Sequence, residues 1–135
     1  MSTKEKLHLY QDFVDSVISK DSTDIDEYIK RLEYLNSVGI NMALMDTAAT
    51  GMSSESGELL DIVKKLKFHG KEWDASTQEH LEKELGDVIF YWSTMCKALN
   101  VDPYSIIEKN ITKLKNRYPE GFESKKSQFR EKGDI

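Results

Sequence analysis

The sequence contains a single cysteine, two prolines and seven glycines among its 135 residues. One cysteine excludes an internal disulfide, and the apolar neighbours of Cys96 predict a buried structural thiol rather than a nucleophile. So few prolines and glycines suit a helical protein better than one built from strands and turns. The chain has no run of 18 apolar residues, and its first residues lack the apolar core of a signal peptide. We therefore expect a cytosolic protein with no membrane partner.

Charge and length narrow the class of protein further. Nineteen basic and 24 acidic side chains give a net charge of −5, which argues against a nucleic-acid-binding surface. A chain of 135 residues suits one domain, and 39% hydrophobic with 32% charged residues is typical of a helical protein. No convincing β-alternating run and no glycine-rich phosphate loop is present. The sequence therefore predicts an all-α fold.

The spacing of apolar residues predicts an antiparallel bundle of four to five helices. The expected helices are residues 4–19, a second helix that Ser22 or Thr23 caps, and residues 41–67, 77–99 and 103–117. Residues 68–74 are expected to turn the chain, so that the two long helices run antiparallel. We interpret residues 1–122 as one domain, with an N-terminal helical extension at 1–40 and a core at 41–122, followed by a polar, flexible tail at 123–135.

Two pairs of carboxylates interrupt this apolar pattern, Glu55 with Glu58 and Glu84 with Asp87. Glu55 fills a gap in an apolar seam of the first long helix, which consists of Met45, Ala48, Met52, Leu59, Ile62 and Leu66. The second pair is expected on the flank of another seam, which consists of Leu81, Leu85, Val88, Trp92, Met95 and Leu99. Antiparallel packing would gather all four carboxylates into one pocket.

Carboxylates gathered in this way repel one another, so a cation is expected among them. Oxygen ligands without nearby cysteine or histidine favour a hard ion, Mg²⁺ first and Mn²⁺ as a laboratory substitute. Gly57 and Gly86 lie inside the two pairs, and glycine in a helix interior costs roughly 1 kcal/mol relative to alanine. We therefore expect a close backbone approach at both glycines, beside the metal.

Other polar residues extend the candidate site. Asn110, Lys113 and Arg117 follow one side of the last expected helix, as an amide and two cations. Tyr91 lies one turn after the second acidic pair, and Lys65 lies two turns after the first. The histidines His69 and His80 are interpreted as surface residues with no metal-ligand partner at helical spacing.

Three blocks of the sequence match a known pattern when they are read in order. They are Gly51-Met-Ser-Ser-Glu55-Ser-Gly-Glu58-Leu-Leu, Lys83-Glu84-Leu-Gly-Asp87-Val, and Asn110-Ile-Thr-Lys113-Leu-Lys-Asn-Arg117-Tyr-Pro-Glu-Gly-Phe122. Together they span about residues 41–122 and resemble the MazG-like nucleoside triphosphate pyrophosphohydrolases. Residues 1–40 lie outside the resemblance.

The resemblance implies an all-α enzyme in which both acidic pairs bind Mg²⁺. Such an enzyme cleaves a nucleoside triphosphate between its α- and β-phosphates, giving a nucleoside monophosphate and pyrophosphate. It also implies a homo-oligomer, either a dimer or a tetramer, and of these we expect the tetramer. We favour deoxynucleoside triphosphates as substrates, with nucleotide-pool control as the role.

Within this scheme the four acids are catalytic as metal ligands, and either Glu55 or Glu58 can activate water. Lys113 and Arg117 are expected to contact phosphate oxygens, where Lys65 can join them. The amide of Asn110 would contact sugar or phosphate. The ring or hydroxyl of Tyr91 would contact the sugar or the base.

Two alternatives come from other classes of protein. A di-iron bundle also uses acids on antiparallel helices, but it needs two Glu-x-x-His motifs, and the form Glu5-x-x-His8 lies outside the acidic pairs. A helical regulator could use the same four acids to sense nucleotide or Mg²⁺ without turnover. Product formation separates this regulator from the enzyme.

Overall fold

The computed structural model describes residues 2–129, and every helix or strand assigned in this range is an α-helix. The all-α prediction is therefore confirmed. The chain divides into two compact units, Met1–Met42 and Ala43–Ile135. None of the helices within residues 2–129 is both long enough and apolar enough to cross a membrane.

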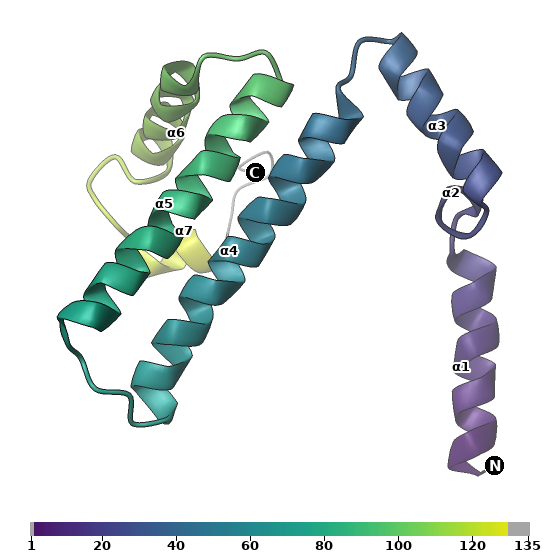
Figure 1. The fold of residues 1–135 in the computed structure, drawn as a ribbon, viewed down its shortest axis with the longest axis horizontal. Coiled ribbons are helices and arrows are strands. Elements are labelled where there is room, and N and C mark those ends of the chain that lie inside the picture. Colours follow the sequence, from purple (N-terminus) through teal and green to yellow (C-terminus); the bar gives the residue numbers. More distant parts are fainter. Residues whose placement is uncertain (1, 130–135) are drawn as a thin grey trace. The chain divides into compact units, whose positions relative to one another are not determined.

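The N-terminal unit contains α1 (Thr3–Val17), α2 (Lys20–Thr23) and α3 (Ile25–Ser37) (Figure 1). Ser2 and Glu5 form a capping box at the start of α1. The Asp24 carboxylate caps α3 by accepting the backbone N–H groups of Asp26 and Glu27. The predicted cap at Ser22 or Thr23 is therefore wrong. A carboxylate at this position accepts hydrogen bonds from the free N–H groups, and its negative charge interacts favourably with the positive end of the helix dipole.

The sequences of α1 and α3 are amphipathic, but no residue of α1, α2 or α3 is buried. Their large apolar side chains are exposed, for example Leu7, Tyr10 and Phe13 on α1 and Ile25 and Ile29 on α3. This unit positions no part of the acidic site described below.

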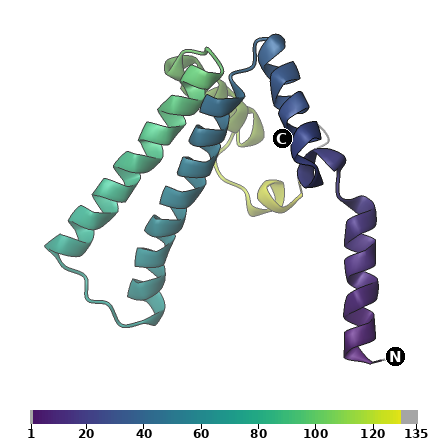
Figure 2. The same cartoon turned by 45° about the vertical axis from the view of Figure 1, so that its right-hand side comes forward.

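The C-terminal unit is built on two long helices, α4 (Met42–Phe68) and α5 (Ala75–Ala98), which run side by side and antiparallel (Figures 1 and 2). The Asp74 carboxylate begins α5 by accepting the N–H of Thr77 at 2.7 Å. On α4 the predicted seam is confirmed, since Ala48 and Ile62 are buried and its other members are half-buried. The Cys96 thiol is buried as well, as its neighbours predicted.

The predicted seam of α5 is partly wrong. Leu85 is 60% exposed, whereas Glu84, expected on the flank, is only 7% exposed. The buried and half-buried side of α5 passes through Leu81, Glu84, Val88 and Tyr91. Adjacent residues of a helix are rotated about 100° from each other around its axis. Glu84 and Leu85 therefore point in different directions, and the carboxylate faces the interface in place of the leucine.

Two shorter helices complete the C-terminal unit, α6 (Pro103–Arg117) and α7 (Ser124–Gln128). The predicted start of α6 is confirmed, because Asp102 accepts the N–H of Tyr104 and Pro103 occupies the first turn. The sequence predicted no helix after Arg117, so α7 is an addition to the expected elements. Residues 130–135 of the expected tail lie outside the described range.

Candidate metal centre

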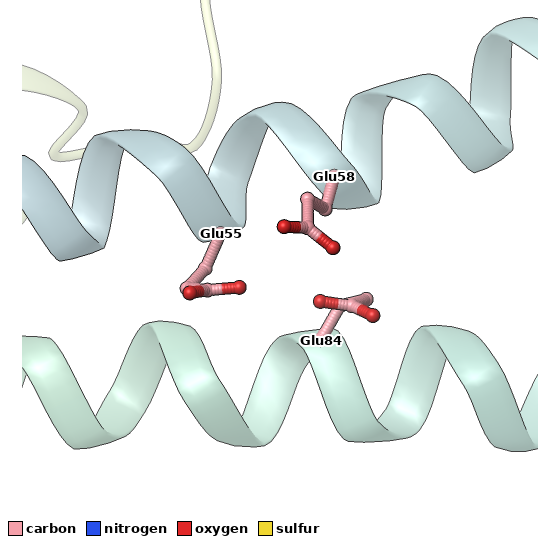
Figure 3. A group of neighbouring side chains, drawn as sticks. All are labelled: Glu55, Glu58 and Glu84. Atoms are coloured by element: carbon pink, nitrogen blue, oxygen red, sulfur yellow. The ribbon is translucent and has the colours of Figure 1, made fainter.

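Three carboxylates meet across α4 and α5. Glu55 and Glu58 lie one turn apart on α4 and point toward Glu84 on α5 (Figure 3). One carboxylate oxygen from each residue lies within 4.8 Å of the other two. Their i, i+3 spacing places the two α4 acids on one side of that helix, and packing of α5 brings in the third. We call these three residues the acidic cluster.

The acidic cluster has an excess of negative charge at Glu55. Partial burial raises the pKa of the Glu55 carboxyl, and the charges of Glu58, Asp87 and Glu84 raise it further. A hydrogen bond with Glu84 acts in the same direction. The cluster therefore favours either a proton on Glu55 or a cation among the oxygens.

The donor set fits a hard divalent cation. All of its ligand atoms are carboxylate oxygens, which Mg²⁺ and Mn²⁺ prefer. Oxygens on opposite sides of one Mg²⁺ are about 4 Å apart, since each lies about 2.1 Å from the ion. Separations of up to 4.8 Å are thus close to the span of one coordination sphere. These residues can together hold a metal ion.

The fourth predicted ligand, Asp87, lies outside the acidic cluster. Its side chain is exposed, and it is not among the three residues whose oxygens meet. Its charge nevertheless raises the pKa of Glu55, more than that of Glu84 does. The structure thus brings three of the four predicted acids together and places Asp87 nearby.

His80 is exposed, as predicted, but it contacts the acidic cluster, so the prediction that it has no metal-ligand partner at helical spacing is wrong. Its Nε2 atom lies 2.9 Å from Oε1 of Glu84. The two residues are four positions apart on α5, a spacing that places side chains on the same side of a helix. This spacing was the signal in the sequence that could have revealed the contact. The other histidine of the prediction, His69, is exposed.

A glycine does allow the two long helices to approach, but it is Gly51. A Cβ atom added to Gly51 would lie 2.2 Å from Cε1 of Tyr91, whereas one added to Gly57 or Gly86 would meet nothing within 4 Å. The close approach expected at Gly57 and Gly86 is therefore wrong. The ring of Tyr91 is half-buried against α4 at Gly51. A side chain at position 51 would therefore require either this ring or one of the two helices to move.

Lys65 forms an ion pair within α4. Its Nζ lies 2.6 Å from Oδ2 of Asp61, and Nζ of Lys64 lies 2.5 Å from Oδ1. Hydrogen bonds from these two lysines lower the pKa of Asp61 to about 2. The structure therefore places Lys65 two turns from Glu58, as predicted, with Asp61 as its partner.

The remaining predicted substrate residues lie together on α6. Asn110 and Lys113 are exposed, and Arg117 is half-buried. The guanidinium carbon of Arg117 lies 5.9 Å from the centre of the Tyr118 ring. Their shared helix confirms the local spacing that the sequence predicted, while their contact with substrate stays a prediction.

The fold and the acidic cluster define an all-α protein with a candidate divalent-metal centre between two antiparallel helices. The family model of the MazG nucleotide pyrophosphohydrolase domain matches residues 45–122, and the chain belongs to this family. The resemblance inferred from three sequence blocks is thereby confirmed. The match includes the whole acidic cluster and α6, and it excludes the N-terminal unit up to Met42.

One similar protein is the gene 37 protein of Mycobacterium phage L5. It is 34% identical over 74 residues, which cover 53% of this chain and 63% of the phage protein. The chain therefore spans less than two thirds of the length of this relative. No solved structure matches the chain.

Proposed function

We propose that this protein is a Mg²⁺-dependent nucleoside triphosphate pyrophosphohydrolase. It cleaves the phosphoanhydride bond between the α- and β-phosphates and releases a nucleoside monophosphate and pyrophosphate. The observation that carries the proposal is the meeting of Glu55, Glu58 and Glu84 within the region that matches the family. Oxygen ligands, excess negative charge and the family match together support a divalent cation at this point.

Glu55, Glu58 and Glu84 would hold the ion, with Asp87 adding negative charge beside it or joining as a further ligand. Bound Mg²⁺ would supply positive charge to the phosphate oxygens and acidify water. Either Glu55 or Glu58 can accept a proton from the attacking water. The negative charge of the cluster also favours a substrate that arrives together with a cation.

The substrate contacts in this proposal come from α4, α5 and α6. Lys113 and Arg117 bind phosphate oxygens, and Asn110 donates to a phosphate or a sugar oxygen. Lys65 reaches a phosphate by leaving Asp61, which retains Lys64 as a partner. The half-buried ring of Tyr91 would present its edge or hydroxyl to the sugar or base.

We propose deoxynucleoside triphosphates as the substrate class and nucleotide-pool control as the role. We also propose a homo-oligomer, a dimer or a tetramer, because large apolar side chains of the C-terminal unit are exposed in the single chain. Examples are Leu60 on α4 and Leu85, Ile89 and Phe90 on α5. Exposed apolar surface of this kind favours association. Light scattering coupled to size-exclusion chromatography measures the oligomeric state directly.

The test of the reaction is product analysis by ion-exchange chromatography. The full chain is incubated with Mg²⁺ and each common or deoxy triphosphate in turn, with a Glu84→Gln variant as control. Monophosphate and pyrophosphate from the wild type alone are expected. Diphosphate with orthophosphate would contradict the proposal. Binding of triphosphate without turnover of any of them would favour the nucleotide-sensing regulator instead.

A further inference from the structure

His80 is the histidine that contacts the acidic cluster from outside it. It lies one turn before Glu84 on α5, with its Nε2 atom 2.9 Å from Oε1 of Glu84. The side chain of Glu84 is only 10% exposed, while that of His80 is 55% exposed. The imidazole thus lies at the solvent-facing edge of the cluster and reaches inward to its most buried carboxylate.

The contact has a consequence for the geometry of Glu84. This carboxylate faces Glu55 and Glu58 across the helix pair, and like charges push it away from them. A donor that holds one of its oxygens restricts rotation of the carboxylate and opposes that displacement. Groups that hydrogen-bond to metal ligands orient them, and their loss typically costs 10- to 100-fold in metal affinity.

We propose that His80 is a positioning residue for the metal centre: its Nε2–H donates to Oε1 of Glu84 and orients the carboxylate toward a divalent cation shared with Glu55 and Glu58. His80 acts through Glu84 and contacts neither substrate nor ion. The inference rests on the proposed function, because it requires the acidic cluster to hold a divalent cation.

Gln78 and Glu82 form an ordinary surface contact with the same four-residue spacing on α5. Nε2 of Gln78 donates to Oε1 of Glu82 at 2.9 Å, also across four residues, and both side chains are exposed. Glu82 is not part of the acidic cluster. Gln78 is therefore a matched control: it shares helix, spacing, distance and acceptor type with His80, but not the buried acceptor.

The test uses Mn²⁺ as the probe and the full chain without nucleotide. Free Mn²⁺ is titrated by electron paramagnetic resonance at one neutral pH, and circular dichroism checks helix content. His80→Ala is expected to weaken Mn²⁺ binding about 10-fold. His80→Gln is expected to restore it, because the glutamine amide nitrogen can reach the position of Nε2. Gln78→Ala is expected to bind as the wild type does.

The outcomes separate this inference from the function on which it rests. Wild-type Mn²⁺ affinity in His80→Ala, together with lost binding in Glu84→Gln, would overturn the positioning role and leave the metal centre intact. Equal losses in His80→Ala and Gln78→Ala would also overturn it. Wild-type affinity in Glu84→Gln would overturn the metal centre itself. Should His80→Ala not fold, His80→Asn serves in its place, since its shorter amide cannot reach Glu84.

Discussion

Two groups of charges on α4 have opposite effects on their carboxylates. Asp61 forms ion pairs with Lys64 and Lys65 of its own helix, and these cations lower its pKa to about 2. Glu55, less than two turns earlier, lies among acids from α4 and α5, and its pKa is raised. All three residues of the group around Asp61 belong to α4. The group around Glu55 is assembled from two helices, and the charges that shift the pKa of Glu55 are those of other acids.

The difference shows that electrostatic repulsion which opposes folding is concentrated at the acidic cluster. A paired surface acid adds a little stability, whereas a cluster of acids at a helix interface reduces it until a proton or a cation arrives. A carboxyl group whose pKa is raised by burial and by neighbouring acids is more typical of a functional site than of a structural ion pair. The contrast between Asp61 and Glu55 therefore supports the acidic cluster as the site of chemistry.

The largest expected effect is on turnover. Glu84→Gln removes the one carboxylate that α5 adds to the cluster, so pyrophosphate release should fall by more than about 100-fold. Glu82→Gln changes an acid on the same helix outside the cluster, and its rate should stay within about twofold of the wild type. Initial rates of pyrophosphate release, with circular dichroism for helix content, measure both. Near-normal turnover in Glu84→Gln would contradict the assigned role.

The next effect is on stability when metal is added. At a Mn²⁺ concentration about 100 times its Kd, binding stabilises the folded state by about 2.7 kcal/mol. For a chain of this size, that should raise the Tm by roughly 5–15 °C. The rise should disappear in Glu84→Gln and persist in Asp61→Asn, because Asp61 lies outside the cluster. Thermal melts with Mn²⁺ and with a chelator measure it, and a rise that survives in Glu84→Gln would place the ion elsewhere.

A third effect concerns the contact of Tyr91 on α5 with Gly51 on α4. Gly51→Ala places a Cβ 2.2 Å from the Tyr91 ring, so the ring or a helix must move, at a cost of about 1–3 kcal/mol. Mn²⁺ affinity should fall as well, since Glu84 shares α5 with Tyr91. Gly57→Ala meets open space and should stabilise the protein by up to about 1 kcal/mol. Urea unfolding compares them, and equal stability of the two variants would contradict the contact.

The smallest effect is the pH dependence of stability in the metal-free protein. The pKa of Glu55 in the folded protein is raised above its ordinary value of 4.5. Ionised Glu55 therefore lowers the free energy of unfolding. This destabilisation is absent below pH 4.5 and grows as the pH rises from 4.5 toward the native pKa. Glu55→Gln should therefore raise the Tm at pH 7 and leave it unchanged near pH 4. The gain should be no more than about 3 °C, because the group is only half-buried.

Asp61 should show the opposite sign. Its native pKa of about 2 lies below its ordinary value of 3.8, so its stabilisation is present above pH 3.8 and is lost as pH falls toward 2. Asp61→Asn should lower the Tm at pH 7, by less as the pH approaches 3. Melts of both variants between pH 3 and 8 test the pair of signs. A change of Tm in the same direction in both variants at pH 7 would contradict the opposite pKa shifts of Glu55 and Asp61.

The sequence predicted much of the C-terminal unit because its signals are local. The seam of α4 follows from the spacing of residues such as Ala48 and Ile62, and the cap of α6 follows from Asp102 and Pro103. The seam of α5 was misplaced, because Leu85 is apolar and was expected to face inward in preference to Glu84. Burial of a carboxylate in place of a leucine runs against the usual hydrophobic pattern, and functional sites are where such reversals occur.

The sequence by itself determined the long helices, the cap of α6, and the four-residue spacing behind contacts such as Asp61 with Lys65 and His80 with Glu84, although neither contact was predicted. These follow from the fixed geometry of one helix. Only the tertiary structure decided which side of α5 faces α4, and with it the meeting of Glu84 with Glu55 and the contact of Tyr91 with Gly51. The rotation of a helix about its own axis depends on how all facing side chains pack at once, which local spacing leaves open.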